Sequence, residues 1–179
     1  KGGMPTASGG HVGLPIMLTQ SREHATHRVR AGLSLRLASE SCMSTPIIID
    51  TDMGVDDAMA VALALASPEL EVVGLASVGG NVCLDQATRN IGRLLAGLGI
   101  KQWPKIARGL DQPSSLLDAK DVHGEDGLGK VDLPTPERLE PGGYVELYEE
   151  LIDKHGEALT IVAIGPLTNL AALLRDRPG

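Results

Sequence analysis

After Pro46, hydrophobic positions follow two alternating patterns. Short continuous apolar runs at 46–50, 70–78 and 159–164, and a weaker one at 105–107, are typical of strands buried on both faces. Apolar positions in 56–66, 84–98, 144–155 and 167–175 predict helices instead. Such alternation predicts an α/β fold, with an open, mostly parallel sheet covered by helices on both faces. Residues 109–136, rich in Gly, Asp and Pro, predict a long loop that is either functional or disordered.

The first 45 residues lack this order and differ in charge. They hold five basic and two acidic residues, whereas residues 46–179 hold 11 basic and 21 acidic ones. We therefore predict a disordered extension over 1–45 and a folded domain over 46–179. We interpret this extension as sequence that is no part of the fold. The weaker alternative is an organelle transit segment.

Composition excludes several classes of function. The 179 residues include 2% aromatic side chains and a net charge of −7, which disfavour nucleic-acid binding by stacking or by phosphate contacts. No apolar run reaches the roughly 18 residues that a membrane helix needs. Two cysteines, Cys42 and Cys83, make no disulfide framework, and no export signal is convincing, so we expect a cytoplasmic protein.

Acidic residues crowd the end of the first predicted strand. Asp50, Asp52, Asp56 and Asp57 occupy four of eight consecutive positions, and Gly54 permits a tight turn among them. Carboxylates this close repel one another, and a hard cation such as Ca²⁺ or Mg²⁺ relieves the repulsion. An acidic helix start would explain Asp56 and Asp57, but it leaves the two earlier aspartates at the strand end unexplained.

Other polar groups follow the remaining strands. Asn81 comes after two glycines at the second strand end, His123 lies in the long loop, and Ile164 ends the last strand with a carbonyl able to ligate a hard cation. Taken alone, Asn81 also fits an ordinary turn, His123 a surface histidine, and the segment after Ile164 a simple strand-to-helix turn. Because ligands bind beyond the carboxyl ends of parallel strands, we expect these groups at one site.

The segment I-I-I-D-T-D-M-G-V-D-D-A-M-A (47–60) resembles the N-terminal signature of the inosine/uridine-preferring nucleoside hydrolases. The later pieces V-G-G-N (78–81), H-G-E-D-G-L-G (123–129) and A-I-G-P-L-T-N-L-A (163–171) follow in the order of that family. The resemblance covers about residues 46–179. It implies a Rossmann-like sheet and an enzyme that cleaves the N-glycosidic bond of ribonucleosides with water, using a tightly bound Ca²⁺.

The resemblance also implies a role for each acidic residue and its neighbours. Asp52 and Asp57 would bind calcium through their carboxylates, and the Ile164 carbonyl would be a further ligand. Asp52 would also take the proton from calcium-bound water, while Asp50 would orient the cluster from behind it.

The same comparison assigns the substrate contacts. Asp56 would hydrogen-bond a ribose hydroxyl, Asn81 would lie against the ribose and the water, and His123 would stand near the nucleobase. The chemistry is consistent with these roles, because a bound cation lowers the pKa of water and carboxylates stabilise the positive charge that develops on the sugar.

The chain departs from the family pattern in three places. Met53 stands where Pro is common, and Asp121 stands where many members have His, which leaves the nucleobase preference open. The chain also ends at Gly179, whereas family members continue with a further calcium-binding Asp, more ribose contacts and usually a His. We therefore expect an incomplete sheet, weak metal binding and little turnover by this chain alone, and a homo-oligomer for a full-length protein.

Two other classes stay open at this point. A phosphatase of the haloacid dehalogenase type also begins with an apolar strand and D-x-D, although the Asp56-Asp57 pair fits it less well. The second alternative is a half-domain that binds a nucleoside without cleaving it.

Overall fold

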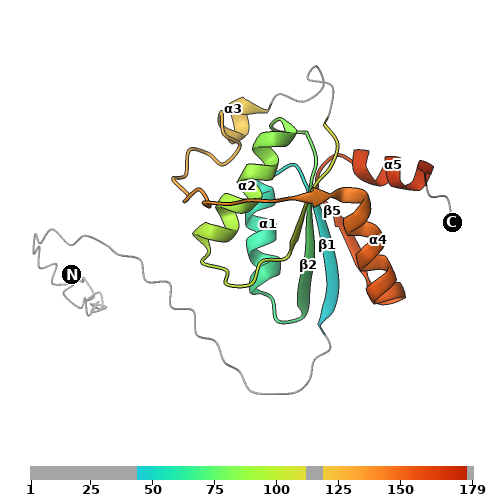
Figure 1. Cartoon of the computed structure of the whole chain (residues 1–179). Coiled ribbons are helices and arrows are strands. Elements are labelled where there is room, and N and C mark those ends of the chain that lie inside the picture. Colours follow the sequence, from blue (N-terminus) through green and yellow to red (C-terminus); the bar gives the residue numbers. More distant parts are fainter. Residues whose placement is uncertain (1–43, 112–118, 177–179) are drawn as a thin grey trace, which may run out of the picture. The chain divides into compact units, whose positions relative to one another are not determined.

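The computed structural model describes residues 44–111 and 119–176 (Figure 1). The strands are β1 (Thr45–Thr51), β2 (Leu70–Ser77), β3 (Lys105–Arg108), β4 (Gly142–Gly143) and β5 (Thr160–Ala163). The helices are α1 (Val55–Ala66), α2 (Leu84–Gly97), α3 (Lys120–His123), α4 (Tyr144–His155), the 3₁₀ turn η1 (Gly156–Ala158) and α5 (Thr168–Asp176). The predicted extension lies outside the described residues except for its last two positions, and β1 already starts at Thr45.

The strands form one parallel sheet in the order β4-β3-β2-β1-β5. This confirms the predicted open α/β architecture. Each predicted strand and helix is present, with ends that differ from the prediction by at most one residue. The two-residue β4 and the one-turn α3 were not predicted. The long loop prediction holds for most of its described part, although α3 interrupts it and residues 112–118 lie outside the description.

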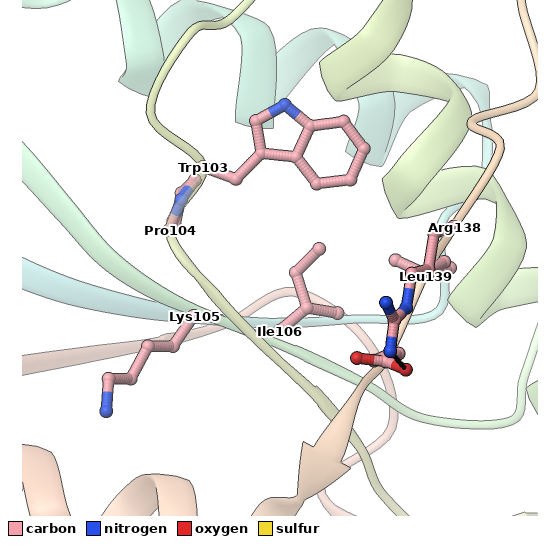
Figure 2. Close-up of a pocket in the computed structure, with 7 residues that line it drawn as sticks. Trp103, Pro104, Lys105, Ile106, Arg138 and Leu139 are labelled. Atoms are coloured by element: carbon pink, nitrogen blue, oxygen red, sulfur yellow. Dashed lines mark hydrogen bonds and ion pairs between the residues drawn. The ribbon is translucent and has the colours of Figure 1, made fainter.

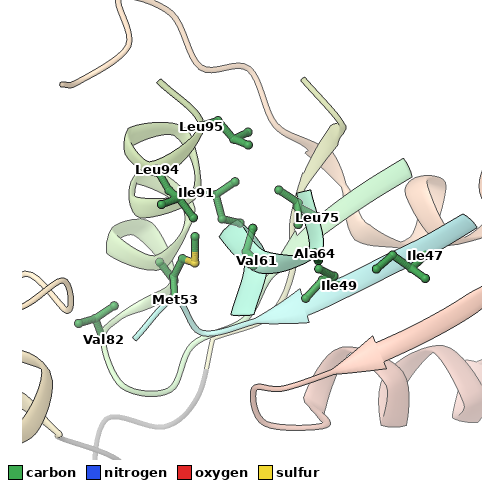
Figure 3. Close-up of a cluster of buried hydrophobic side chains, with 11 residues drawn as sticks. Ile47, Ile49, Met53, Val61, Ala64, Leu75, Val82, Ile91, Leu94 and Leu95 are labelled. Atoms are coloured by element: carbon green, nitrogen blue, oxygen red, sulfur yellow. The ribbon is translucent and has the colours of Figure 1, made fainter. Parts of the chain in front are cut away.

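Alternate residues of β1 bury opposite faces of the sheet. Ile47 and Ile49 belong to a core cluster with α1 and α2, which Figure 3 shows around Val61, Ile91 and Leu94. Ile48 points to the other face, where a second cluster includes side chains of α4 and α5. Helices therefore cover both faces, which explains why the central strands are continuous apolar runs rather than alternating ones.

This arrangement places the acidic segment at one edge of the sheet. The residues after β1, β2 and β5 all lie at the carboxyl edge, because the three strands are parallel neighbours. No helix in the described part of the chain is long and apolar enough to cross a membrane.

Candidate active site

The turn between β1 and α1 is built around Met53. This residue has a φ of 54°, in the left-handed region that side chains other than glycine rarely adopt. Its N–H donates to the Thr51 hydroxyl at 3.0 Å, and its side chain is fully buried in the first core cluster (Figure 3). Gly54, which follows Met53 in the predicted tight turn, has an ordinary φ of −71°.

Gly54 is instead required for close packing. A Cβ at this position would lie 2.5 Å from Nδ2 of Asn81 and 2.9 Å from Nδ1 of His123. The missing side chain thus lets the segments after β1 and β2 and the end of α3 meet. The backbone of Met53 is one that proline, common at this position in the family, could not adopt, because proline is fixed near a φ of −65°.

Asp57 is buried and plays two structural parts. Its Oδ2 accepts the Gly54 N–H at 3.1 Å and caps α1, and its Oδ1 accepts the Thr51 hydroxyl at 2.9 Å. Asp57 therefore does cap the helix, as the alternative of an acidic helix start predicted. Burial, followed by the nearby charge of Asp52, raises the pKa of Asp57 to about 7. Two neighbouring carboxylates repel each other, and a divalent cation bound between such a pair removes the repulsion.

Asp52 is held by the segment that follows β2. Its Oδ2 accepts the backbone N–H of Asn81 at 2.8 Å, and its Oδ1 accepts the Asn81 side-chain amide at 3.3 Å. A Cβ on Gly80 would lie 2.0 Å from Asp52 Oδ2, so only glycine allows this approach. Asp52 is 5% exposed. The structure therefore brings Asn81 to the aspartates as expected, and it adds a contact that fixes the Asp52 carboxylate.

His123 reaches the same edge from the long loop. Its Nδ1 accepts the Val55 N–H at 3.2 Å, which leaves the proton of a neutral ring on Nε2. The same nitrogen lies 3.7 Å from Oδ1 of Asp56, whose side chain is 81% exposed while that of His123 is 12% exposed. Asp56 thus stands at the surface of the site, and His123 packs against the start of α1 beside it.

The segment after β5 lies directly against Asp52. The N–H groups of Ile164 and Gly165 donate to the Asp50 carbonyl at 2.9 and 3.2 Å. A Cβ on Gly165 would lie 2.8 Å from the Asp52 backbone nitrogen. Ile164 therefore joins the same edge of the sheet, as the sequence predicts.

Asp50 lies behind this cluster and is 1% exposed. Its Oδ2 accepts hydrogen bonds from the Tyr148 hydroxyl at 2.7 Å and from the Asn169 amide at 2.9 Å. Burial raises its pKa, although both hydrogen bonds oppose that shift. Its position supports the predicted indirect role, in which it orients the edge of the sheet rather than facing a ligand.

Asn90 on α2 is a buried polar residue that the sequence analysis missed. Its amide donates to the carbonyl of Asp126 at 2.7 Å and lies 3.5 Å from that of Met53. It thereby joins the turn after β1 to the loop that carries His123. Arg93, which forms an ion pair with Asp126 at 3.2 Å, strengthens the same junction. The sequence could have indicated a buried role for Asn90, because its amide side chain stands among the apolar positions of the predicted helix 84–98.

The carboxylates of the candidate site suit a hard cation, but they are too few to complete its coordination shell. Asp52 and Asp57 supply carboxylate oxygens, and Ca²⁺ takes six to eight oxygen ligands. Within residues 44–111 and 119–176, no three His, Cys, Asp or Glu side chains form a metal-binding group. Any cation held here would therefore need backbone, water or substrate oxygens besides the two aspartates.

A separate hollow lies near the starts of β3 and β4 (Figure 2). It has a volume of about 380 Å³ and is lined by Trp103, Pro104, Lys105, Ile106, Arg138, Leu139 and Glu140. Because parallel strands carry their ligands at the carboxyl ends, this hollow does not belong to the candidate site.

Comparison with known proteins identifies the class. The profile of the inosine-uridine preferring nucleoside hydrolase family matches residues 47–179, and the chain belongs to this family. Membership excludes the dehalogenase-type alternative. Uridine nucleosidase 1 of Arabidopsis thaliana is 43% identical over 135 residues, which are 73% of this chain and 40% of that protein. The pyrimidine-specific ribonucleoside hydrolase RihA of Salmonella schwarzengrund is 44% identical over 139 residues, 76% of this chain and 44% of that protein.

Solved structures agree with the fold. A purine-preferring ribonucleoside hydrolase from Gardnerella vaginalis superposes with a TM-score of 0.67 at 34% identity, covering 74% of this chain and 44% of that one. The plant nucleoside hydrolase PpNRh1 gives a TM-score of 0.65 at 36% identity, covering 75% of this chain and 43% of that one. The chain thus spans less than half the length of these relatives.

Proposed function

We propose that this chain carries the cation-binding half of a ribonucleoside hydrolase site, which cleaves the N-glycosidic bond to give ribose and a free base. One observation supports the proposal above all. In a chain of this family, Asp52 and Asp57 lie buried together at the carboxyl edge of the sheet, where the pKa of Asp57 is raised to about 7. Neutralising that pair with a cation offsets the electrostatic cost of its burial.

The proposed cation is Ca²⁺, held by the carboxylates of Asp52 and Asp57 and by the Ile164 carbonyl. When bound, it would lower the pKa of a coordinated water to a range in which a carboxylate can deprotonate it. Asp52 is the proposed general base. The two hydrogen bonds from Asn81 keep its carboxylate in one orientation, which a proton acceptor requires.

The remaining residues receive substrate roles. The exposed carboxylate of Asp56 would accept a hydrogen bond from a ribose hydroxyl, and Asn81 would contact the ribose and the attacking water. His123 would face the nucleobase with its Nε2–H, since Nδ1 already accepts the Val55 N–H. The printed names of the relatives include uridine-, pyrimidine- and purine-directed enzymes, so the proposal extends to ribonucleosides as a class.

We propose little turnover by the 179-residue chain alone, because the relatives use more than twice the length that it covers. A homo-oligomer is proposed for a full-length protein, in line with the family resemblance. The proposed compartment is the cytoplasm, in line with the absence of a disulfide framework in the sequence.

The test is calorimetric titration of the chain with Ca²⁺, followed by assays for free ribose and free base with inosine and uridine. We expect weak calcium binding that Asp52→Asn and Asp57→Asn both abolish, and base release far slower than by an intact hydrolase. Ribose release at a rate like that of an intact enzyme would refute the proposal that turnover depends on the part of the relatives that this chain does not cover. Saturable nucleoside binding in calcium without any base release would favour the non-catalytic binding half-domain.

A further inference from the structure

The side chain and the backbone of Asp50 hold the same segment at two points. Its carbonyl accepts the N–H groups of Ile164 and Gly165, and its Oδ2 accepts the Asn169 amide at 2.9 Å. The segment from Ile164 to Asn169, which runs from the end of β5 into the first turn of α5, is therefore attached to one residue of β1 at both ends. Tyr148, on α4, donates to the same Oδ2 at 2.7 Å.

Asn169 is a tightly enclosed junction. It is fully buried, its amide N–H₂ also donates to the Ser77 carbonyl at 3.1 Å, and its Oδ1 accepts the Leu110 N–H at 2.8 Å. A Cβ on Gly109 would lie 2.2 Å from that Oδ1, so backbone closes the space beside the amide. One side chain thus joins the residues at the ends of three neighbouring strands.

This junction bears on the site through Gly165. A Cβ there would lie 2.8 Å from both the Asp52 nitrogen and Cγ1 of Val78, so the turn after β5 has no free space on that side. A shift of the turn would therefore move the Ile164 carbonyl relative to the Asp52 backbone.

We propose that Tyr148 and Asn169 are positioning residues, which act through Asp50 to set the place of the Ile164–Gly165 turn beside Asp52. They contact neither cation nor substrate in this role. The inference deepens the proposed function, since the turn is the one whose Ile164 carbonyl is proposed as a calcium ligand. Partners that orient metal ligands typically change metal affinity by about 10- to 100-fold when they are removed.

The test compares Tyr148→Phe with Tyr144→Phe in the whole chain. Tyr148→Phe keeps the aromatic ring and removes only the hydroxyl that reaches Asp50, while Tyr144→Phe makes the same change on the same helix. Asn169→Ala is the second variant, because it removes the other donor to Oδ2. Hydrogen exchange without metal then measures how firmly the Ile164–Gly165 turn is held. Calorimetric titration with Ca²⁺ measures the resulting change in calcium affinity.

In Tyr148→Phe we expect the Ile164 and Gly165 amides to exchange about tenfold faster, the effect of losing one hydrogen bond to a carboxylate. The amide of Leu98, bonded to Leu94 at the end of α2 and outside this segment, should keep its rate. Calcium affinity should fall by roughly tenfold. Tyr144→Phe should match the wild type in both measurements.

Equal acceleration at Leu98 would overturn the inference, because it would mean general destabilisation of the fold. Unchanged calcium affinity despite selective acceleration would also overturn it. A wild-type chain that binds no calcium would instead refute the proposed function, and the exchange comparison would then decide the positioning of the turn by itself.

Discussion

The buried Asp57 predicts an unusual dependence of stability on pH. Burial, with the nearby charge of Asp52, raises its pKa in the folded chain from 3.8 to about 7. The folded state therefore binds more protons than the unfolded state between these two values. The contribution of Asp57 to the free energy of unfolding is therefore fully present below pH 3.8 and is lost as the pH rises through about 7. The cation-free chain should thus be more stable in mild acid than in mild base.

The magnitude follows from the shift. At 1.36 kcal/mol per pKa unit, the loss between about pH 5 and about pH 8 is about 2.6 kcal/mol for the full shift. Water penetration and local relaxation reduce such values, so we expect about 1 to 2 kcal/mol. The raised pKa of Asp50 acts in the same direction. Asp85 and Asp126 have lowered pKa values, so they titrate below this pH range and leave the slope unchanged.

Urea unfolding of the metal-free chain across this pH range measures the effect, with circular dichroism as the signal. Asp57→Asn should flatten the curve, because Asn can still accept the Gly54 N–H and pair with the Thr51 hydroxyl without titrating. Asp56→Asn is the matched control, since it removes a carboxylate from the same helix turn that is 81% exposed. Parallel curves for the wild type and Asp57→Asn would show that Asp57 does not titrate in this range, and the reasoning would fail.

Other predictions concern the same edge of the sheet. Calcium binding should weaken by about tenfold per unit below pH 7, because the cation must displace a proton from Asp57; titrations at several pH values measure this. Gly80→Ala should push the Asp52 carboxylate aside and lower calcium affinity at least about tenfold, whereas Gly142→Ala, whose Cβ would meet nothing closer than 3.9 Å, should not. Thr51→Val should cost about 1 to 3 kcal/mol in urea unfolding, because the hydroxyl serves both Met53 and Asp57.

Strong local patterns made most of the fold predictable. The run Ile47–Asp50 is rich in β-branched residues and fits a strand buried on both faces, and β1 forms there between β2 and β5. The strand β4 carried no such signal. Gly142 and Gly143 form a strand only because they pair with Ala107 and Arg108 of β3, which is a tertiary effect.

The sequence predicted residues of the candidate site, but it did not predict the residues that support them. The motifs predicted a site at Asp52, Asp57 and Asn81 because of their residue types and their places at strand ends, and the structure brings these three residues together. Tyr148 and Asn169 could not be found that way, since their partner Asp50 lies 98 and 119 residues away in the sequence. The left-handed conformation of Met53 was also hidden, because the neighbouring Gly54 is the residue type usually associated with it.

The cost of this acidic edge is itself an argument for a ligand. A helix start needs one capping carboxylate, and Asp57 alone meets that need by accepting the Gly54 N–H. The chain nevertheless buries Asp50 and Asp52 as well, and Oδ1 of Asp50 has no hydrogen-bond partner in the described structure. Buried carboxylates without cationic partners destabilise a fold. Proteins keep such violations mainly at functional sites, where a ligand restores the balance. The divalent cation that we propose between Asp52 and Asp57 would remove the largest part of this cost.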